Sequence, residues 1–326
     1  MTDSISIAAN RPPRRAIVAG ATGTIGRATV AALLRHGHAV TCIVRPGSAA
    51  KHAAALAGTT VVEASLAPDL TLGPCDVVIS CIASRTGVPA DAWAVDHAAN
   101  LHLLNAAQRA GADHFILLSA ICVQKPLLAF QHAKLAFEAA LTASGLRYSI
   151  VRPTAFFKSL SGQIERVRTG RPFLIFGDGE LTACKPISDR DLAEFITACI
   201  ADETRWNRIL PIGGPGDAVT PRQQGEALFA MLNKPPRFRS VPLALLDTIG
   251  GALGLFGKVI PGLATKAELA RIGRYYASES MLVLDPATGQ YDAAATPSTG
   301  TETLFDYYRA IIDGTASAER GDHAVF

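Results

Sequence analysis

The first half of the chain alternates short apolar runs with longer stretches of helical periodicity, and this alternation restricts the possible folds more than any other feature. Apolar runs rich in β-branched residues are typical of strands, and apolar residues that recur every three to four positions are typical of helices. Strands are predicted at 15–20, 39–45, 59–64, 76–83, 114–120 and 148–153, and helices at 24–36, 91–110 and 131–144. Several strands are apolar almost throughout, as in a parallel sheet that helices cover on both faces. The sequence therefore predicts an α/β fold with a doubly wound parallel sheet.

The second half of the chain is less regular and predicts a smaller, mostly helical C-terminal lobe. In FLIFGDGELTACK, the GDG at 177–179 predicts a hairpin turn after a strand. A helix is predicted to begin at Ser188 or Asp189, and RILPIGG at 208–214 predicts a further strand. The predicted divisions are flexible tails at 1–13 and 314–326, a sheet domain at 14–155 to which 186–214 returns, and the lobe at 156–185 and 215–313.

Composition excludes several classes of protein. The chain carries 31 basic and 28 acidic residues, a net charge of +3, without a dense Lys/Arg run, which argues against nucleic acid as a partner. The six cysteines are scattered without a CxxC pair, so we expect free thiols and no metal site. The first residues, MTDSISIAANRPPRR, lack the apolar core of a signal peptide, so a cytoplasmic location is expected.

One apolar segment, at 241–263, is about long enough to cross a bilayer. Asp247 and Lys258 argue against a span, because a charge at the centre of a membrane helix costs about 2.5–3.5 kcal/mol. Buried core helices are the favoured interpretation. The wall of an apolar substrate pocket and a surface that touches a membrane remain open as alternatives.

A glycine-rich turn joins the first predicted strand to the first predicted helix. In VAGATGTIGRATVAALL, Gly20, Gly23 and Gly26 permit a tight turn and let backbone N–H groups approach a pyrophosphate at the positive end of the helix. The sheet domain is therefore predicted to be a dinucleotide-binding Rossmann domain. The coenzyme-binding positions predicted in this turn are Gly20, Thr22, Gly23, Thr24, Ile25 and Gly26.

The end of the second strand predicts which dinucleotide binds. NAD-specific sites place an acid there for the ribose hydroxyls, whereas this chain has Arg45, whose guanidinium suits a 2′-phosphate. NADPH is therefore the predicted cofactor, and Arg27 and Lys51 either contribute or are surface charges. At the end of the fourth strand, ISCIAS is predicted to line the coenzyme through Cys81, Ile82 and Ala83, although Cys81 fits core packing equally well.

Four features together resemble the extended or atypical short-chain dehydrogenase/reductases. They are GATGTIG, ISCIAS, the strand LLSA with Ser119, and a lysine, Lys134, early in the next helix. In that superfamily a serine and a Tyr-x-x-x-Lys motif carry alcohol and ketone chemistry, but Phe130 stands where the tyrosine would be. The resemblance implies that Lys134 and Ser119 are catalytic and contact the coenzyme, with Lys134 on the nicotinamide ribose, and that Pro153 is a further coenzyme contact. Ser119 fits the plain end of a strand equally well, and an exposed helix lysine is the alternative for Lys134.

Two longer segments, 152–193 and 274–292, are similar to the divinyl chlorophyllide 8-vinyl reductase family. The resemblance implies NADPH-dependent reduction of the 8-vinyl group of divinyl chlorophyllide or divinyl protochlorophyllide to ethyl, in chlorophyll or bacteriochlorophyll synthesis. It also implies a tetrapyrrole as the small-molecule substrate, held by the C-terminal lobe, while the oligomeric state stays open. The substrate-binding candidates are Phe156, Phe157, Lys158, Phe176, Lys185 and Tyr276.

The candidates in the lobe have alternative interpretations. The phenylalanines, among them Phe173, also fit an ordinary core, and Lys158 and Lys185 fit a propionate carboxylate, the coenzyme or the surface. Two other functions fit the whole chain. One is a different reductase of conjugated double bonds, such as an isoflavone-reductase-like protein. The other is an NADPH-sensing regulator or assembly factor that binds coenzyme without turnover. Peripheral contact with a photosynthetic membrane remains open.

Overall fold

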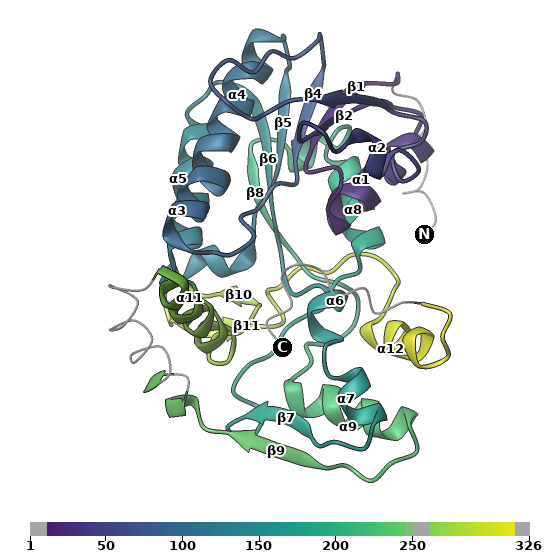
Figure 1. Cartoon of the computed structure of the whole chain (residues 1–326), viewed down its shortest axis with the longest axis vertical. Coiled ribbons are helices and arrows are strands. Elements are labelled where there is room, and N and C mark those ends of the chain that lie inside the picture. The colour runs from purple at the N-terminus through teal and green to yellow at the C-terminus, as the bar shows by residue number, and fades with distance from the viewer. Residues whose placement is uncertain (1–11, 246, 249–260, 317–326) are drawn as a thin grey trace.

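Seven parallel strands form the central sheet of this computed structural model, which describes residues 12–245, 247–248 and 261–316 (Figure 1). The strands are β1 (Arg15–Ala19), β2 (Ala39–Val44), β3 (Thr60–Glu63), β4 (Val77–Ser80), β5 (His114–Leu118), β6 (Arg147–Pro153) and β8 (Arg208–Ile212). Their order is β3-β2-β1-β4-β5-β6-β8, and all neighbours are parallel. The order reverses between β1 and β4, and ligands of such sheets bind beyond the carboxyl ends of the strands at this point. The predicted fold class is confirmed.

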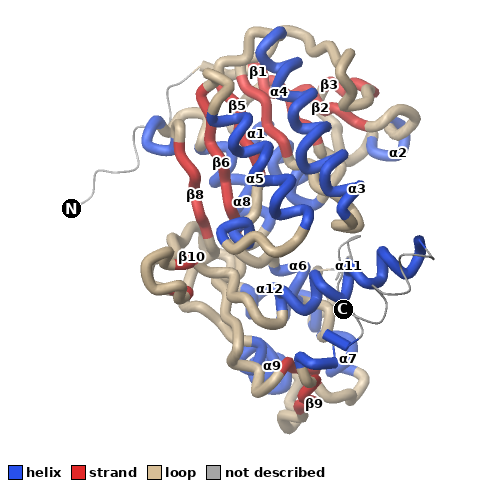
Figure 2. The backbone as a smooth tube through the Cα atoms, turned by 90° about the vertical axis from the view of Figure 1, so that its left-hand side faces the viewer, coloured by secondary structure: helices blue, strands red, loops and turns tan. Residues whose placement is uncertain are grey.

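Helices cover both faces of the sheet (Figures 1 and 2). One face carries α1 (Thr24–Arg35) and α8 (Asp189–Ala198), which pack against each other. The other face carries α4 (Asn100–Arg109) and α5 (Ala129–Thr142). The short helix α2 (Ala49–His52) follows β2. Both faces of the sheet are therefore dry, which explains why its strands are apolar on both sides.

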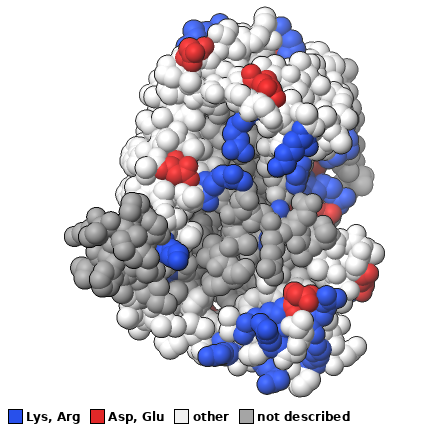
Figure 3. Space-filling model, in the orientation of Figure 1, with Lys and Arg blue, Asp and Glu red and all other residues white. Residues whose placement is uncertain are grey.

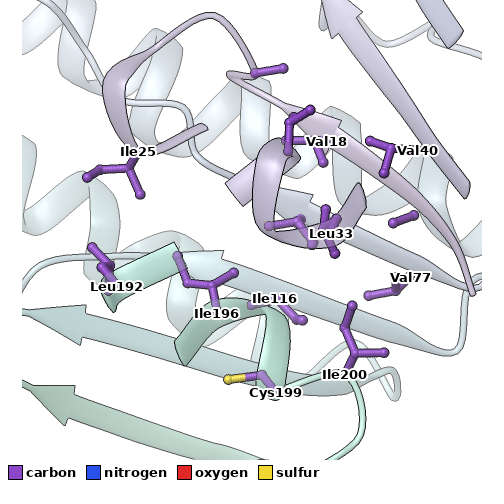
Figure 4. Close-up of a cluster of buried hydrophobic side chains, with 14 of the residues drawn as sticks. Val18, Ile25, Leu33, Val40, Val77, Ile116, Leu192, Ile196, Cys199 and Ile200 are labelled. Atoms are coloured by element: carbon purple, nitrogen blue, oxygen red, sulfur yellow. The ribbon is translucent and has the colours of Figure 1, made fainter. Parts of the chain in front are cut away.

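Alternate residues of each central strand enter two separate cores. In β4, Val77 and Ile79 pack toward α1 and α8, whereas Val78 packs toward α4 and α5 beside Phe137. Figure 4 shows the first core, where Val18, Val40 and Val77 of the sheet lie near Leu33 of α1 and Leu192 and Ile196 of α8. Each fully buried aliphatic side chain of this size contributes about 1.5–3 kcal/mol to folding, so the two cores fix the strand order that shapes the site.

The predicted helix at 91–110 is interrupted. The structure has α3 (Pro89–Ala92), then a π-helical segment, η2 (Trp93–Ala99), and then α4. The side-chain amide of Asn100 donates to the carbonyl oxygens of Val95 at 3.4 Å and Asp96 at 3.1 Å, so it bonds to carbonyl groups in the widened turn. Wide turns of this kind recur at functional sites.

The C-terminal lobe has its own core. It contains α6 (Phe157–Leu160), α7 (Ile164–Arg168), α9 (Pro221–Met231) and α12 (Leu304–Ile312), which enclose Phe173, Leu228 and Tyr308. The strand β7 (Phe173–Phe176) pairs in parallel with β9 (Phe238–Val241), so the predicted hairpin at 177–179 is wrong. The turn itself is present, but Phe238 packs edge-on against Phe173 and Phe229, and this contact aligns β9 with β7.

A further part of the lobe packs against the end of the sheet domain. It consists of α11 (Pro261–Tyr276) and the antiparallel pair β10 (Val283–Leu284) and β11 (Tyr291–Asp292). Ile272 and Tyr275 of α11 share a buried cluster with Ile121 and Cys122, which lie in the 3₁₀ helix η3 (Ile121–Gln124) that follows β5. This cluster joins the lobe to the carboxyl edge of the sheet.

Part of the apolar segment at 241–263 lies outside the described residues, namely 246 and 249–260. The predicted tails fall largely outside them as well, at 1–11 and 317–326. Among the described helices, none combines the length and the hydropathy that a membrane crossing requires.

Candidate active site

The turn between β1 and α1 is shaped by close backbone contacts. Gly20 has a φ of 79°, and a Cβ there would lie 2.6 Å from the carbonyl carbon of Cys81, so only glycine fits. A Cβ on Gly26 would collide with the carbonyl oxygen of Gly20. Gly23 precedes α1 without a side-chain cap. The first N–H groups of α1 therefore remain available for an anion such as a pyrophosphate, and these residues fit a dinucleotide.

Lys158 reaches this turn from the opposite side of the site. Its Nζ donates to Thr24 Oγ1 at 3.1 Å, although the two residues are far apart in the chain. The sequence left Lys158 between a substrate propionate and the coenzyme. Its position beside the positive end of α1 favours the phosphates of the coenzyme, because the ammonium and the helix dipole would attract the same anion.

Arg45 follows β2 directly, in a loop that is held in place by Glu63. The Glu63 carboxylate accepts hydrogen bonds from the N–H groups of Gly47 at 2.9 Å and Ala49 at 2.7 Å, and these bonds lower its pKa. Glu63, which pairs with Val44 at the end of β2, is thus already bound to backbone N–H groups. The Arg45 side chain is exposed, and within the described part of the chain it makes no ion pair. Lys51 is also exposed, in α2.

The segment after β4 lies against the glycine turn. The backbone of Cys81 and Ile82 is within 3 Å of the place where a Gly20 Cβ would stand. The Cys81 side chain packs against the core under α1 and α8, and burial raises the pKa of its thiol to about 12. The thiol is therefore neutral, and it is the backbone of Cys81 that borders the glycine turn. Ile82 packs against the core on the opposite face, and Ala83 follows it.

Lys134 forms a buried ion pair with Asp96. Its Nζ lies 2.9 Å from Asp96 Oδ1, and the exposed fractions of the two side chains are 11% and 1%. The N–H of Ser84 also donates to Asp96 Oδ1, at 3.4 Å. Asp96 Oδ2 is buried and has no hydrogen-bond partner among the described residues. Sequence reasoning missed Asp96, and its one signal was an acid within an otherwise apolar helical stretch.

The π-helical segment explains how Asp96 reaches Lys134. Ser80, at the end of β4, donates through Oγ to Asn100 Oδ1 at 2.6 Å, while the Asn100 amide bonds to the carbonyl of Asp96. The wide turn is thereby tied to the carboxyl end of β4. This places Asp96 and Lys134 near the point where the strand order reverses.

Ser119 stands apart from this pair. Its hydroxyl donates to Glu138 Oε1 at 2.5 Å, and Arg152 bonds to the same carboxylate, with Nε 3.2 Å from Oε1. Ser119 and Glu138 are buried and Arg152 is largely so. The hydroxyl proton of Ser119 is used within the protein, so towards a ligand Ser119 can only accept a hydrogen bond. Pro153 ends β6 nearby at the same edge of the sheet.

The predicted substrate residues fall into different places. Phe157 is buried in the lobe core, with its ring against Tyr307, and Phe156 packs against the core under α1 and α8. Lys185 donates to the carbonyl oxygen of Thr296 at 3.0 Å. Phe176 is half-buried at the end of β7.

Tyr276, in contrast, lies beside η3, with its hydroxyl 3.9 Å from Cys122 Sγ. Of the substrate-binding candidates in the lobe, the structure brings Tyr276 to the carboxyl edge of β5 and Lys158 to the glycine turn.

Comparisons with known proteins place this chain among known families. The profile of the NAD(P)H-binding family matches residues 20–203. The chloroplastic divinyl chlorophyllide a 8-vinyl-reductase of Oryza sativa subsp. indica is 51% identical over 333 residues, which cover 95% of this chain and 82% of that protein. The photosystem II assembly factor Ycf39 of a Synechocystis species is 28% identical over 211 residues, which cover 61% of this chain and 62% of that protein.

Among solved structures, a similar one is an NADPH-dependent quinone oxidoreductase from Escherichia coli, in complex with NADPH. Its TM-score is 0.67 at 20% identity, and the match covers 91% of this chain and 99% of that chain. At this identity the likeness concerns the fold.

Proposed function

We propose that this chain, which belongs to the divinyl chlorophyllide a 8-vinyl-reductase family, reduces the 8-vinyl group of a divinyl chlorophyllide or divinyl protochlorophyllide to ethyl, in chlorophyll or bacteriochlorophyll synthesis. It is an oxidoreductase that acts on a CH–CH bond. The identity of 51% across 95% of the chain carries this proposal. The alternative of an assembly factor has weaker support, since the relative of that kind is 28% identical over a smaller part of the chain.

NADPH is the proposed coenzyme. Three features support it: the uncapped start of α1, the ammonium of Lys158 beside Thr24, and the exposed guanidinium of Arg45 at the end of β2. Glu63 is held by two backbone N–H groups, so it is poorly placed to take the ribose hydroxyls that an NAD-specific acid would bind. Arg45 would pair with the 2′-phosphate through two parallel hydrogen bonds.

The proposed chemistry needs no phenol at position 130. When bound, the nicotinamide supplies a hydride to the terminal vinyl carbon. The negative charge then spreads through the tetrapyrrole, whereas in ketone reduction it would collect on one oxygen that needs a donor. Phe130 cannot donate a hydrogen bond, and the absence of a phenol at this position therefore costs the reaction little. Lys134 holds the ribose and takes part in proton relay, while Asp96 fixes the direction of its ammonium.

Incubation of the purified protein with NADPH and divinyl chlorophyllide tests this function. The pigment spectrum should change from the divinyl to the monovinyl form while the absorbance of NADPH falls in equal molar amount. A regulator would bind NADPH and leave both signals unchanged. A reductase of another conjugated alkene would oxidise NADPH only with a different acceptor, such as an isoflavone.

The choice of coenzyme has its own test. Arg45→Ala should raise the KM for NADPH about tenfold or more, equivalent to about 1.4 kcal/mol, and leave the KM for NADH unchanged. Arg239→Ala removes an exposed arginine from β9 and serves as the matched control. An equal KM for NADPH in the two variants would contradict the role of Arg45.

We also propose peripheral contact with a photosynthetic membrane. Lysine and arginine side chains gather over the lower end of the molecule in Figure 3, where Figure 1 shows β7, β9 and α9. Residues 161–184 and 220–241 hold seven basic and four acidic side chains. Leu245, just beyond β9, is 48% exposed. The exposed arginines of this region are Arg168, Arg171, Arg237 and Arg239.

Each arginine close to an anionic bilayer contributes about 1 kcal/mol to binding. The protein should therefore float with vesicles that contain an anionic lipid and sediment with neutral ones. Replacement of the four exposed arginines by alanine should abolish flotation, and so should high salt. If flotation persists in that variant and is lost only on removal of residues 241–263, the apolar segment is the contact instead.

A further inference from the structure

Two helices meet over the carboxyl edge of β5. Phe130 and Lys134 lie one turn apart on α5, and Ile272 and Tyr276 lie one turn apart on α11. Phe130 and Ile272 pack in the same cluster. A Cβ built on Gly87 would lie 2.7 Å from Ile272 Cδ1 and 4.0 Å from Phe130 Cδ1. Phe130 and Ile272 therefore both border the loop that contains Gly87. One helical turn further along α5 and α11, Lys134 and Tyr276 lie towards η3.

Cys122 in η3 connects Lys134 with Tyr276. The Tyr276 hydroxyl lies 3.9 Å from Cys122 Sγ. Burial raises the pKa of this thiol, while the Tyr276 hydroxyl and the positive charge of Lys134 act in the opposite direction. Both groups therefore act on the same sulfur atom. The Tyr276 hydroxyl and the Lys134 ammonium are thus both close enough to act on the Cys122 thiol, beside the cluster that contains Phe130 of α5.

The neighbouring residue on the same helix, Tyr275, has a structural role. Tyr275 is 4% exposed, and its hydroxyl donates to the carbonyl oxygens of Cys122 at 2.9 Å and Lys125 at 3.1 Å. Tyr276 is 37% exposed, and among the described residues its hydroxyl has the Cys122 thiol as its one hydrogen-bond partner. Tyr276 therefore offers an accessible ring to a planar ligand and a hydroxyl proton that no strong acceptor holds.

We propose that Tyr276 is the proton donor of the vinyl reduction, supplied by α11 in place of the phenol that α5 lacks at position 130. This inference rests on the proposed function. Hydride addition breaks the C=C π bond, forms a C–H bond at the terminal carbon and leaves the electron pair on the inner carbon and the macrocycle. That pair takes the proton from Tyr276 Oη, which completes the ethyl group.

The phenolate that results regains its proton from water. In the resting protein, burial of the hydroxyl keeps the pKa of Tyr276 well above its ordinary value. The donor form is thus present across the neutral pH range. The proton donor therefore occupies a different position from the donor of ketone reductases, which must lie beside the carbonyl oxygen of the substrate.

Tyr276→Phe keeps the ring and removes the proton. We expect kcat to fall about 100-fold or more, within the range for loss of a general acid, with the KM for the pigment and the Kd for NADPH within twofold of wild type. Tyr275→Phe is the matched control, with a wild-type kcat for the folded protein. In D₂O, wild type should place deuterium on one face of the inner carbon, and Tyr276→Phe on both faces.

The outcomes separate the two proposals. A Tyr276→Phe enzyme with wild-type kcat and single-faced deuterium incorporation would overturn the role of Tyr276 and leave the vinyl reductase function intact. A kcat loss accompanied by an equal rise in the KM for the pigment would also overturn it, because that result indicates that the hydroxyl binds the pigment and does not protonate it. A wild-type protein that binds NADPH but never reduces the vinyl group would overturn both.

Discussion

Removal of Lys134 should destabilise the fold and weaken coenzyme binding by two separable routes. Lys134→Met leaves the Asp96 carboxylate buried without its cation, with an exposed fraction of 1%. Loss of one partner from a buried ion pair costs about 3–5 kcal/mol, a change of roughly 100-fold to a few thousand-fold in the folding equilibrium constant. The same change deletes the ammonium that the coenzyme ribose is expected to meet.

A second substitution separates the two effects. Lys134→Met with Asp96→Asn removes the unpaired charge, so the double variant should regain about 2 kcal/mol or more of the loss, a coupling within the range seen for residues in contact. It should regain no affinity for NADPH, because the coenzyme contact is still missing. Asp96→Asn alone should be milder than Lys134→Met, since the lysine is long enough to turn its head toward water.

Urea unfolding followed by far-UV circular dichroism measures the stability, and fluorescence titration of NADPH measures the affinity. The reasoning about the ion pair is refuted if Lys134→Met unfolds at the same urea concentration as wild type. The coenzyme role of Lys134 is refuted if the single variant binds NADPH as wild type does, or if the double variant restores both properties together.

Two further predictions concern the glycine turn and the pH dependence of stability. Gly26→Ala should abolish measurable NADPH binding in the same titration, because its Cβ would collide with the carbonyl oxygen of Gly20. Gly73→Ala, which meets nothing within 4 Å, should bind normally, and equal affinities would contradict the close approach. Burial lowers the pKa of His114 to about 3 from an ordinary value of 6.5, so this group stabilises the fold above pH 6.5, and that stabilisation is lost as the pH falls towards 3. From pH 7 to pH 4 the loss in the free energy of unfolding is about 3 kcal/mol. Urea unfolding at both pH values should show a smaller difference in stability for His114→Asn than for wild type. An equal difference would assign the acid sensitivity to other groups.

The sheet was predictable because its signals are local. The runs at 15–20, 39–45 and 114–120 became β1, β2 and β5 with ends shifted by a residue or two, since a strand buried on both faces must be apolar throughout. The glycine turn was equally visible, because both a tight turn and a close helix–strand approach demand residues without a side chain.

Features that depend on contacts distant in sequence were not predictable. The parallel pairing of β7 with β9 depends on Phe173 and Phe238, which lie far apart in the chain, whereas a GDG turn suggested a local partner. The π-helical segment at 93–99 depends on Ser80 meeting Asn100, and no periodicity in the sequence reveals a single widened turn.

The candidate site divides in the same way. Gly20, Gly23 and Gly26 lie within one turn and could be found from their spacing. The partners of Lys134 and Lys158 could not, because Asp96 and Thr24 reach them only through the packed sheet and its helices. Tyr276 was found through the family resemblance of its segment, yet its place beside Cys122 required the fold of α11 against η3.

The fate of one hydride tests the central claim most directly. NADPH with deuterium at both C4 positions is incubated with the protein and divinyl chlorophyllide in ordinary water, and the product is examined by NMR spectroscopy. The account predicts one deuterium atom, on the terminal carbon of the new 8-ethyl group. Deuterium on the inner carbon, or an ethyl group without deuterium, would contradict it.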